Sequence, residues 1–87
     1  MDKPDASSRL VHSLSDLMLL PGLSGHEGRV RQYLRASLSR EGIEAQTDRI
    51  GNLIASLPAP DSSAPSVMLF AHMDQIGFFV RRIEADG

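Results

Sequence analysis

The sequence has 87 residues, enough for about one small domain, and its 41% hydrophobic and 23% charged residues are typical of a globular rather than a disordered chain. The formal net charge of −2 excludes a strongly basic surface for nucleic acid or anionic membranes. Cysteine is absent, which excludes a disulfide framework and thiol chemistry. Because no signal peptide and no membrane-spanning segment is apparent, we expect a cytoplasmic protein.

The start of the chain predicts a first amphipathic helix. Ser7 or Ser8 can cap a helix over residues 9–20, which Pro21-Gly22 ends. One face of this helix carries the apolar side chains Leu10, Leu14, Leu17 and Met18.

A second helix is predicted to begin at a capping box. Ser24 stands three residues before Glu27, so each side chain can accept a hydrogen bond from a free N–H group at the helix start. Gly42 is expected just after the helix, in the left-handed conformation. The buried stripe of this helix is predicted to consist of Val30, Tyr33, Leu34 and Leu38.

From Ile43 onward the apolar period changes to two, which indicates strands. Residues 43–48 predict a half-exposed strand, residues 50–52 a turn, and residues 53–57 a second strand. Residues 58–66 contain three prolines and three serines, and they predict a surface loop within the domain.

Two further strands are predicted in the last part of the sequence. Residues 67–71 contain no polar residue, as expected of a strand covered on both faces. Residues 78–83 form the next apolar run, and Asp86-Gly87 after it is a hairpin signal. No return strand follows within the sequence, so we expect the chain to be the front part of a longer protein.

The candidate functional residues are His72 and Asp74, which stand between these two apolar runs. In open α/β sheets, ligands bind beyond the carboxyl ends of strands, where His72 would lie. Histidine is a common metal ligand, and its second ring nitrogen usually donates to a carboxylate, a role that Asp74 could fill. Gly77 allows a bend or a close approach to another backbone segment.

A purely structural interpretation of the same residues remains open at this point. A single histidine at a strand end is commonly a hydrogen-bonded loop residue, and Asp74 could be an Asx-turn or cap residue. His72 and Asp74 alone could not complete a zinc site, which needs at least three protein ligands.

Three segments together carry a resemblance to a known family. They are L-P-G-L-S-G-H-E-G-R-V-R-Q-Y-L (residues 20–34), D-R-I-G-N-L-I-A (residues 48–55) and V-M-L-F-A-H-M-D-Q-I-G-F-F-V (residues 67–80). In this order and spacing the chain resembles the N-terminal part of the glutamyl, deblocking or tetrahedral aminopeptidases, some formerly classed as endoglucanases. Residues 1–87 would then be the N-terminal portion of a catalytic domain of the zinc-exopeptidase-like, three-layer α/β class, with a loop at 58–66.

The resemblance implies roles for individual residues. The family pattern A-H-x-D-E-[IV]-G-F matches residues 71–78, which makes His72 a metal ligand and Asp74 the catalytic carboxylate that orients it. Gln75 departs from the pattern, because the family usually carries glutamate there. This departure leaves the metal role in place and puts in question the local charge and the substrate preference.

The resemblance also implies an activity for the intact protein. The family members are cytosolic metallopeptidases with two divalent ions, zinc or cobalt, and they remove residues from the N-termini of peptides. Their other acidic ligands, general base and late histidine have no counterpart here, so the isolated 87-residue chain is expected to be inactive. Homo-oligomerisation is implied for the intact protein, and no nucleic-acid or membrane partner is expected.

Two alternatives stay open from the sequence. The first is another di-zinc exopeptidase or deacylase that shares an H-x-D motif at a strand end. The second is a complete small α+β module without catalytic activity, which binds a partner through an open sheet edge.

Overall fold

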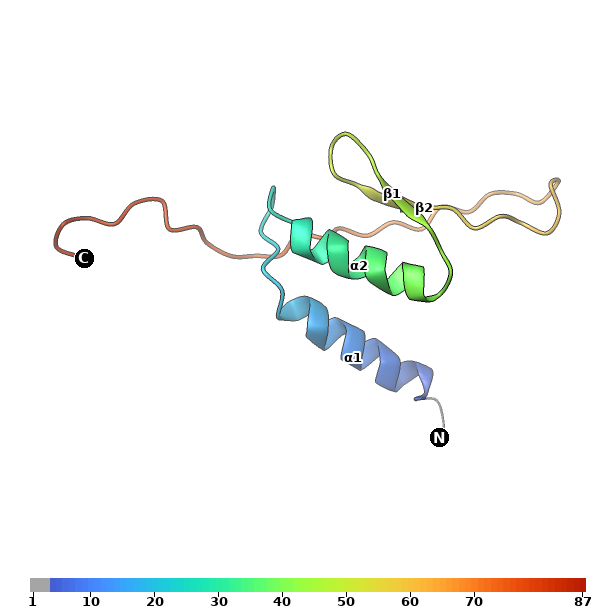
Figure 1. Cartoon of the computed structure of the whole chain (residues 1–87), viewed down its shortest axis with the longest axis horizontal. Coiled ribbons are helices and arrows are strands. Elements are labelled where there is room, and N and C mark those ends of the chain that lie inside the picture. The colour runs from blue at the N-terminus through green and yellow to red at the C-terminus, as the bar shows by residue number, and fades with distance from the viewer. Residues whose placement is uncertain (1–3) are drawn as a thin grey trace.

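The computed structural model describes residues 4–87, in which two helices are followed by a two-stranded antiparallel sheet (Figure 1). Helix α1 comprises Ala6–Met18 and helix α2 comprises Gly28–Arg40. Strand β1 comprises Ala45–Thr47 and strand β2 comprises Leu53–Ala55. This order agrees with the predicted start of an α/β fold. Neither helix in the described part of the chain is long and apolar enough to cross a membrane.

Helix α1 begins earlier than predicted because its cap is Asp5. The Asp5 carboxylate accepts a hydrogen bond from the Ser8 N–H at 2.7 Å, so the predicted cap at Ser7 or Ser8 is wrong. The helix ends at Met18, and the N–H groups of Leu19 and Leu20 close its last turn before Pro21.

The start of helix α2 also differs from the prediction. Glu27 occupies the cap position itself, and its carboxylate accepts from the Gly25 N–H at 2.8 Å rather than completing a capping box with Ser24. A turn closed by the His26 N–H on the Leu23 carbonyl, at 2.8 Å, delays the helix start. The predicted end is confirmed, because Gly42 has a left-handed φ of 75°.

Strands β1 and β2 form a hairpin whose turn is organised by Asp48. Ala45, Gln46 and Thr47 pair with Ala55, Ile54 and Leu53 respectively. In the turn, the Asp48 carboxylate accepts from the backbone N–H groups of Ile50 at 3.0 Å and Asn52 at 2.9 Å. It also accepts from the Asn52 side-chain amide at 2.8 Å. The two predicted strands and their turn are therefore confirmed, although both strands are shorter than predicted.

Hydrogen bonds connect α2 to the hairpin on one side and to α1 on the other (Figure 1). The Arg31 side chain donates to the Gly51 carbonyl at 2.8 Å, and Arg35 donates to the Thr47 hydroxyl. The Tyr33 hydroxyl donates to the Asp16 carboxylate at 3.0 Å. Helix α2 is therefore the central element of the folded part.

The predicted strands at residues 67–71 and 78–83 are wrong for this structure. Both segments lack regular strand structure; in Figure 1 the chain passes behind the hairpin and α2 on its way back from the loop, and its last part extends away from them. Leu69, Phe70 and Phe78 are each more than 90% exposed. A strand needs a neighbour to satisfy its N–H and C=O groups, and no segment of the described chain pairs with these residues. A single bridge lies between the two segments, at Gln75. The turn predicted at residues 85–87 is present, with the Gly87 N–H donating to the Glu84 carbonyl.

Residues 4–87 bury very little apolar surface. Val30, at 5% exposure, is the only buried large apolar side chain among them, whereas Leu34 and Leu38 of the predicted stripe are half-buried. The radius of gyration is 17.5 Å, compared with about 12 Å for a compact domain of this length. The apolar face of α1 and the segments after β2 therefore lie open to solvent.

The turn at Asp48 should lose stability in acid. Hydrogen bonds from the side chain and backbone of Asn52 lower the pKa of the Asp48 carboxyl below its ordinary value. Its contribution to hairpin stability is therefore complete above the ordinary aspartate pKa of about 3.9 and is lost as the pH falls through the lowered value. We expect the Gly51 and Asn52 amide resonances to shift toward disordered positions over that range. Asp48→Ala should show those positions already at pH 7, and Asp61→Ala, in another turn, should not; native-like resonances in Asp48→Ala would contradict the role of Asp48.

Candidate functional site

His72 and Asp74 are brought together in a segment that follows the exposed residues 67–71. The His72 Nδ1 lies 3.1 Å from an Asp74 carboxylate oxygen and 2.9 Å from the Asp74 backbone carbonyl oxygen. The His72 side chain is 86% exposed and the Asp74 side chain 43% exposed. The pair therefore lies at the surface of the described chain, with one edge of the imidazole held and the other edge open.

This geometry defines the tautomer of the neutral imidazole. Both partners of Nδ1 are oxygen acceptors, so Nδ1 carries the ring proton and donates it. The lone pair is then on Nε2, at the opposite edge of the ring. This is the arrangement in which a histidine commonly binds a metal ion, with a carboxylate on its other nitrogen.

The described residues provide only part of a metal site. No group of three or more His, Cys, Asp or Glu side chains within residues 4–87 is placed to hold a metal ion. The donor chemistry of His72 fits a divalent ion such as zinc, but a zinc site needs at least three protein ligands. The roles of His72 as a ligand and of Asp74 as a catalytic carboxylate therefore stay predictions.

The site segment is attached to the connection between α1 and α2. The Gln75 N–H donates to the Gly22 carbonyl at 2.8 Å, and Leu23 and Gln75 form a single parallel bridge. The Gln75 side-chain amide donates to the Leu20 carbonyl. Gln75 therefore makes two long-range hydrogen bonds immediately after the His72–Asp74 pair.

Close packing accompanies this attachment. A Cβ atom at Gly22 would lie 2.8 Å from the Val30 side chain, and one at Gly77 would collide with the Leu23 side chain. The close approach predicted for Gly77 is thus present, to a side chain rather than to backbone. Further along, the rings of His26 and Phe79 lie 4.4 Å apart between centroids and are tilted by 54°. The segment from Gln75 to Phe79 therefore contacts the α1–α2 connection at several points.

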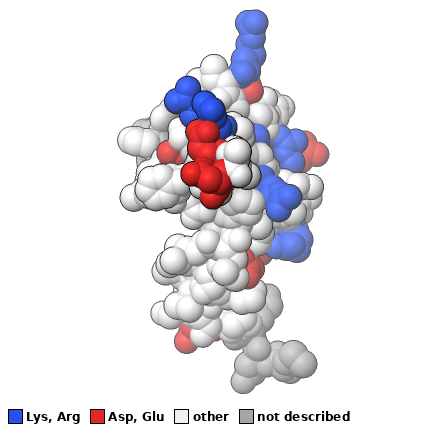
Figure 2. Space-filling model, turned by 90° about the vertical axis from the view of Figure 1, so that its left-hand side faces the viewer, with Lys and Arg blue, Asp and Glu red and all other residues white. Residues whose placement is uncertain are grey.

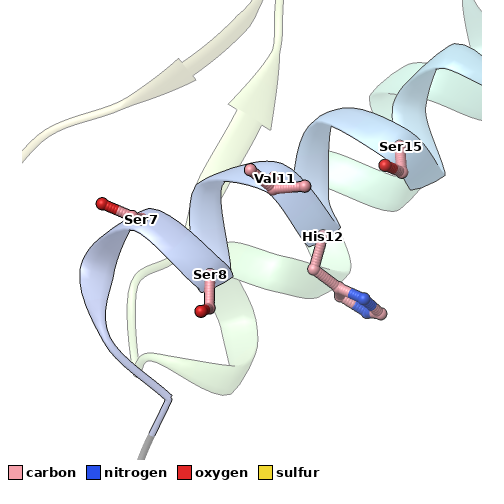
Figure 3. A pocket seen from close by; sticks show the side chains of 5 residues that line it. All are labelled: Ser7, Ser8, Val11, His12 and Ser15. Atoms are coloured by element: carbon pink, nitrogen blue, oxygen red, sulfur yellow. The ribbon is translucent and has the colours of Figure 1, made fainter.

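The remaining histidines and the surface hollows lie outside this pair. His12 is paired with Asp16 on α1 at 3.4 Å and is largely exposed. A shallow hollow of about 480 Å³ is formed by side chains along one face of α1, and Figure 3 shows that they come from this helix alone: Ser7, Ser8, Val11, His12 and Ser15. Since side chains from other elements do not converge there, we assign it no chemistry.

The charges on the surface are mixed in sign. In Figure 2, Lys and Arg side chains gather in the upper part around a small acidic group, while the lower part, over α1, is mostly uncharged. Arg82 pairs with Glu84 at 3.0 Å in the C-terminal segment. The face in this view therefore presents no extended field of one sign.

Comparison with known proteins supports the predicted family. Residues 51–87, which include the His72–Asp74 pair and Gln75, match the family model of the M42 glutamyl aminopeptidases. Over this segment the chain is similar to the M42 glutamyl aminopeptidases. The predicted resemblance is confirmed by this match and by the relatives described below.

Three relatives illustrate the extent of the similarity. SgcX of Escherichia coli is 37% identical over 81 residues, which are 93% of this chain and 22% of the relative. The glutamyl aminopeptidase of Lactococcus lactis is 36% identical over 90% of this chain and 22% of its own length. The lysyl aminopeptidase of Pyrococcus furiosus is 41% identical over 77% of this chain and 19% of its own length. The chain thus spans about a fifth of the length of these relatives, and no solved structure matches it.

Sequence reasoning found the His72–Asp74 pair but missed the attachment through Gln75. The residues that Gln75 contacts are more than fifty positions away, and no local pattern connects them. The glycines at positions 22 and 77 were the available signal, because a glycine beside an apolar run indicates close approach of another segment.

Removing the Asp74 carboxylate should loosen His72. In Asp74→Ala, one of the two acceptors on Nδ1 is lost, so we expect the Nδ1–H tautomer of the neutral ring to become less populated. Long-range ¹H–¹⁵N spectra of the imidazole nitrogens measure the tautomer ratio directly. Glu84→Ala, which removes the exposed carboxylate paired with Arg82, is the matched control and should leave His72 unchanged. An unaltered ratio in Asp74→Ala would show that the carboxylate does not orient the ring.

Proposed function

We propose that the complete protein containing this chain is a metal-dependent aminopeptidase, and that residues 1–87 are the N-terminal portion of its catalytic domain. The observation that carries the proposal is the His72–Asp74 pair, which leaves Nε2 open within the segment that matches the M42 family model. Two of the relatives are a glutamyl and a lysyl aminopeptidase, which supports the same reaction class.

His72 and Asp74 have distinct roles in this proposal. His72 would present the Nε2 lone pair to a divalent ion, zinc or cobalt, of a two-metal centre. Asp74 accepts a hydrogen bond from Nδ1, which orients the ring. The metal centre, when bound, polarises the scissile carbonyl and activates a water molecule. The further ligands and the general base would come from parts of the complete protein that these residues do not include.

We further propose a substrate class, an oligomeric state and a location, which follow from the resemblance to the family. Peptides with a free N-terminal amino group are the substrates, and the protein acts in the cytoplasm as a homo-oligomer. We propose no preferred side chain at the substrate N-terminus, because one relative is named a glutamyl and the other a lysyl aminopeptidase.

The first test is metal-dependent hydrolysis by the complete product of the gene. We expect it to release the aniline from aminoacyl anilides, to lose activity with a chelator and to recover it with zinc or cobalt. N-acyl amino acids should not be hydrolysed, which separates an aminopeptidase from a deacylase. Residues 1–87 alone should be inactive at the same concentration, because they hold too few ligands. Metal-independent activity, or none with any aminoacyl substrate, would refute the proposal.

Substitutions at the pair test the assigned roles in the same protein. Asp74→Ala should lower metal affinity or kcat by about 10- to 100-fold, the usual cost of removing a partner of a ligating histidine. His72→Ala should lose more, because it removes the ligand itself. The control is His12→Ala, an exposed histidine that is also paired with an aspartate, and it should retain wild-type activity. Wild-type metal affinity in His72→Ala would exclude His72 as a ligand.

A further inference from the structure

Gln75 joins the site segment to the helical part of the chain by two different groups. Its backbone N–H donates to the carbonyl of Gly22, and its side-chain amide donates to the carbonyl of Leu20. Both acceptors belong to the connection between α1 and α2. Two bonds from one residue to two carbonyls restrain rotation of the segment about its own axis, which a single bond would not do.

The acceptors are themselves held in place. Gly22 is buried, and a Cβ atom there would press on Val30, the one buried large apolar side chain of the described residues. On the other side of Gln75, Gly77 packs so closely against Leu23 that a side chain would not fit without movement. The connection is therefore a well-defined support for residues 73–77.

The direction of this attachment suits the His72–Asp74 pair. Side chains alternate between opposite sides of an extended backbone, so His72 and Asp74 share one side and Gln75 lies on the other. With Gln75 bonded to the connection, the pair is turned outward, in agreement with the 86% and 43% exposure of its side chains. A rotation of this segment would turn the Nε2 lone pair away from this outward orientation.

The side-chain bond requires a donor, which the amide of Gln75 provides. An ionised carboxylate of the same length, as in glutamate, only accepts hydrogen bonds and could not bond to the Leu20 carbonyl. The bond therefore depends on the amide and not only on the length of the side chain.

We propose that Gln75 is a positioning residue, which directs His72 and Asp74 toward the metal centre through its side-chain bond to Leu20; this rests on the proposed peptidase function. It does not touch the metal ion or the substrate. The bond increases the fraction of time for which Nε2 points toward the metal centre. Loss of the bond should therefore lower metal affinity and kcat, and leave substrate binding largely unchanged.

The test compares two variants of the complete protein. Gln75→Met keeps the length of the side chain and removes the donor, and Gln75→Glu keeps the shape and leaves only acceptors. We expect both to lower zinc affinity and kcat about three- to tenfold, in line with the loss of one hydrogen bond, with KM changed less than about twofold. Gln32→Met, at an exposed position of α2, is the matched control and should behave as wild type. Amide hydrogen exchange at residues 72–77 should become faster in both Gln75 variants and should not change in Gln32→Met.

The outcomes separate this proposal from the one on which it depends. A wild-type protein without metal-dependent peptidase activity would refute the proposed function, and the exchange rates at residues 72–77 would still report whether the anchor exists. An active wild type whose two Gln75 variants keep wild-type kcat and zinc affinity would overturn the positioning role. So would wild-type behaviour of Gln75→Glu alone, because the donor would then be unnecessary. A drop in melting temperature with unchanged kcat and zinc affinity would show a structural role only.

Discussion

The hydrogen bond from the Gln75 N–H to the Gly22 carbonyl is the contact on which the arrangement of the site depends. After strand β2 the chain leaves the folded part, passes through the loop at residues 58–66 and returns beside the start of α2 (Figure 1). The return is fixed where Gln75 meets the α1–α2 connection. His72 and Asp74 stand directly before this point, so their position relative to the helices follows from it.

The folded part is held together largely by polar contacts rather than by a core. Arg31 and Tyr33 reach from α2 to the hairpin turn and to α1, while Val30, at 5% exposure, is the one buried side chain among the large apolar residues described. Partly buried hydrogen bonds of this kind contribute little net stability each, because water can bond to the same groups in the unfolded chain. Most of the exposed large apolar side chains lie on the open face of α1 and in residues 67–71 and 78–83.

The site has the same incomplete character as the fold. The His72–Asp74 pair shows one ligand-type histidine with its second nitrogen held by a carboxylate, and the described residues add no further metal-binding group. The chain spans about a fifth of the relatives it matches. If the complete protein has the proposed function, a chain of this length should contain only some of the metal ligands and only some of the fold, as observed.

Local features were determined by the sequence itself. The two helices, the left-handed Gly42, the Asp48 turn with its two strands, and the H-x-D motif that indicates the family all depend on residues within a few positions of one another. The cap is Asp5 rather than the predicted Ser7 or Ser8, a small error among neighbouring residues that can all act as caps.

The prediction and the structure differ more where the local structure depends on segments far away in the sequence. Residues 67–71 and 78–83 have the composition of strands but form none, because a strand needs a neighbouring segment to satisfy its backbone. The anchoring of Gln75 to Leu20 was likewise decided only by the tertiary structure, since fifty-five positions separate the two residues and no local rule pairs them.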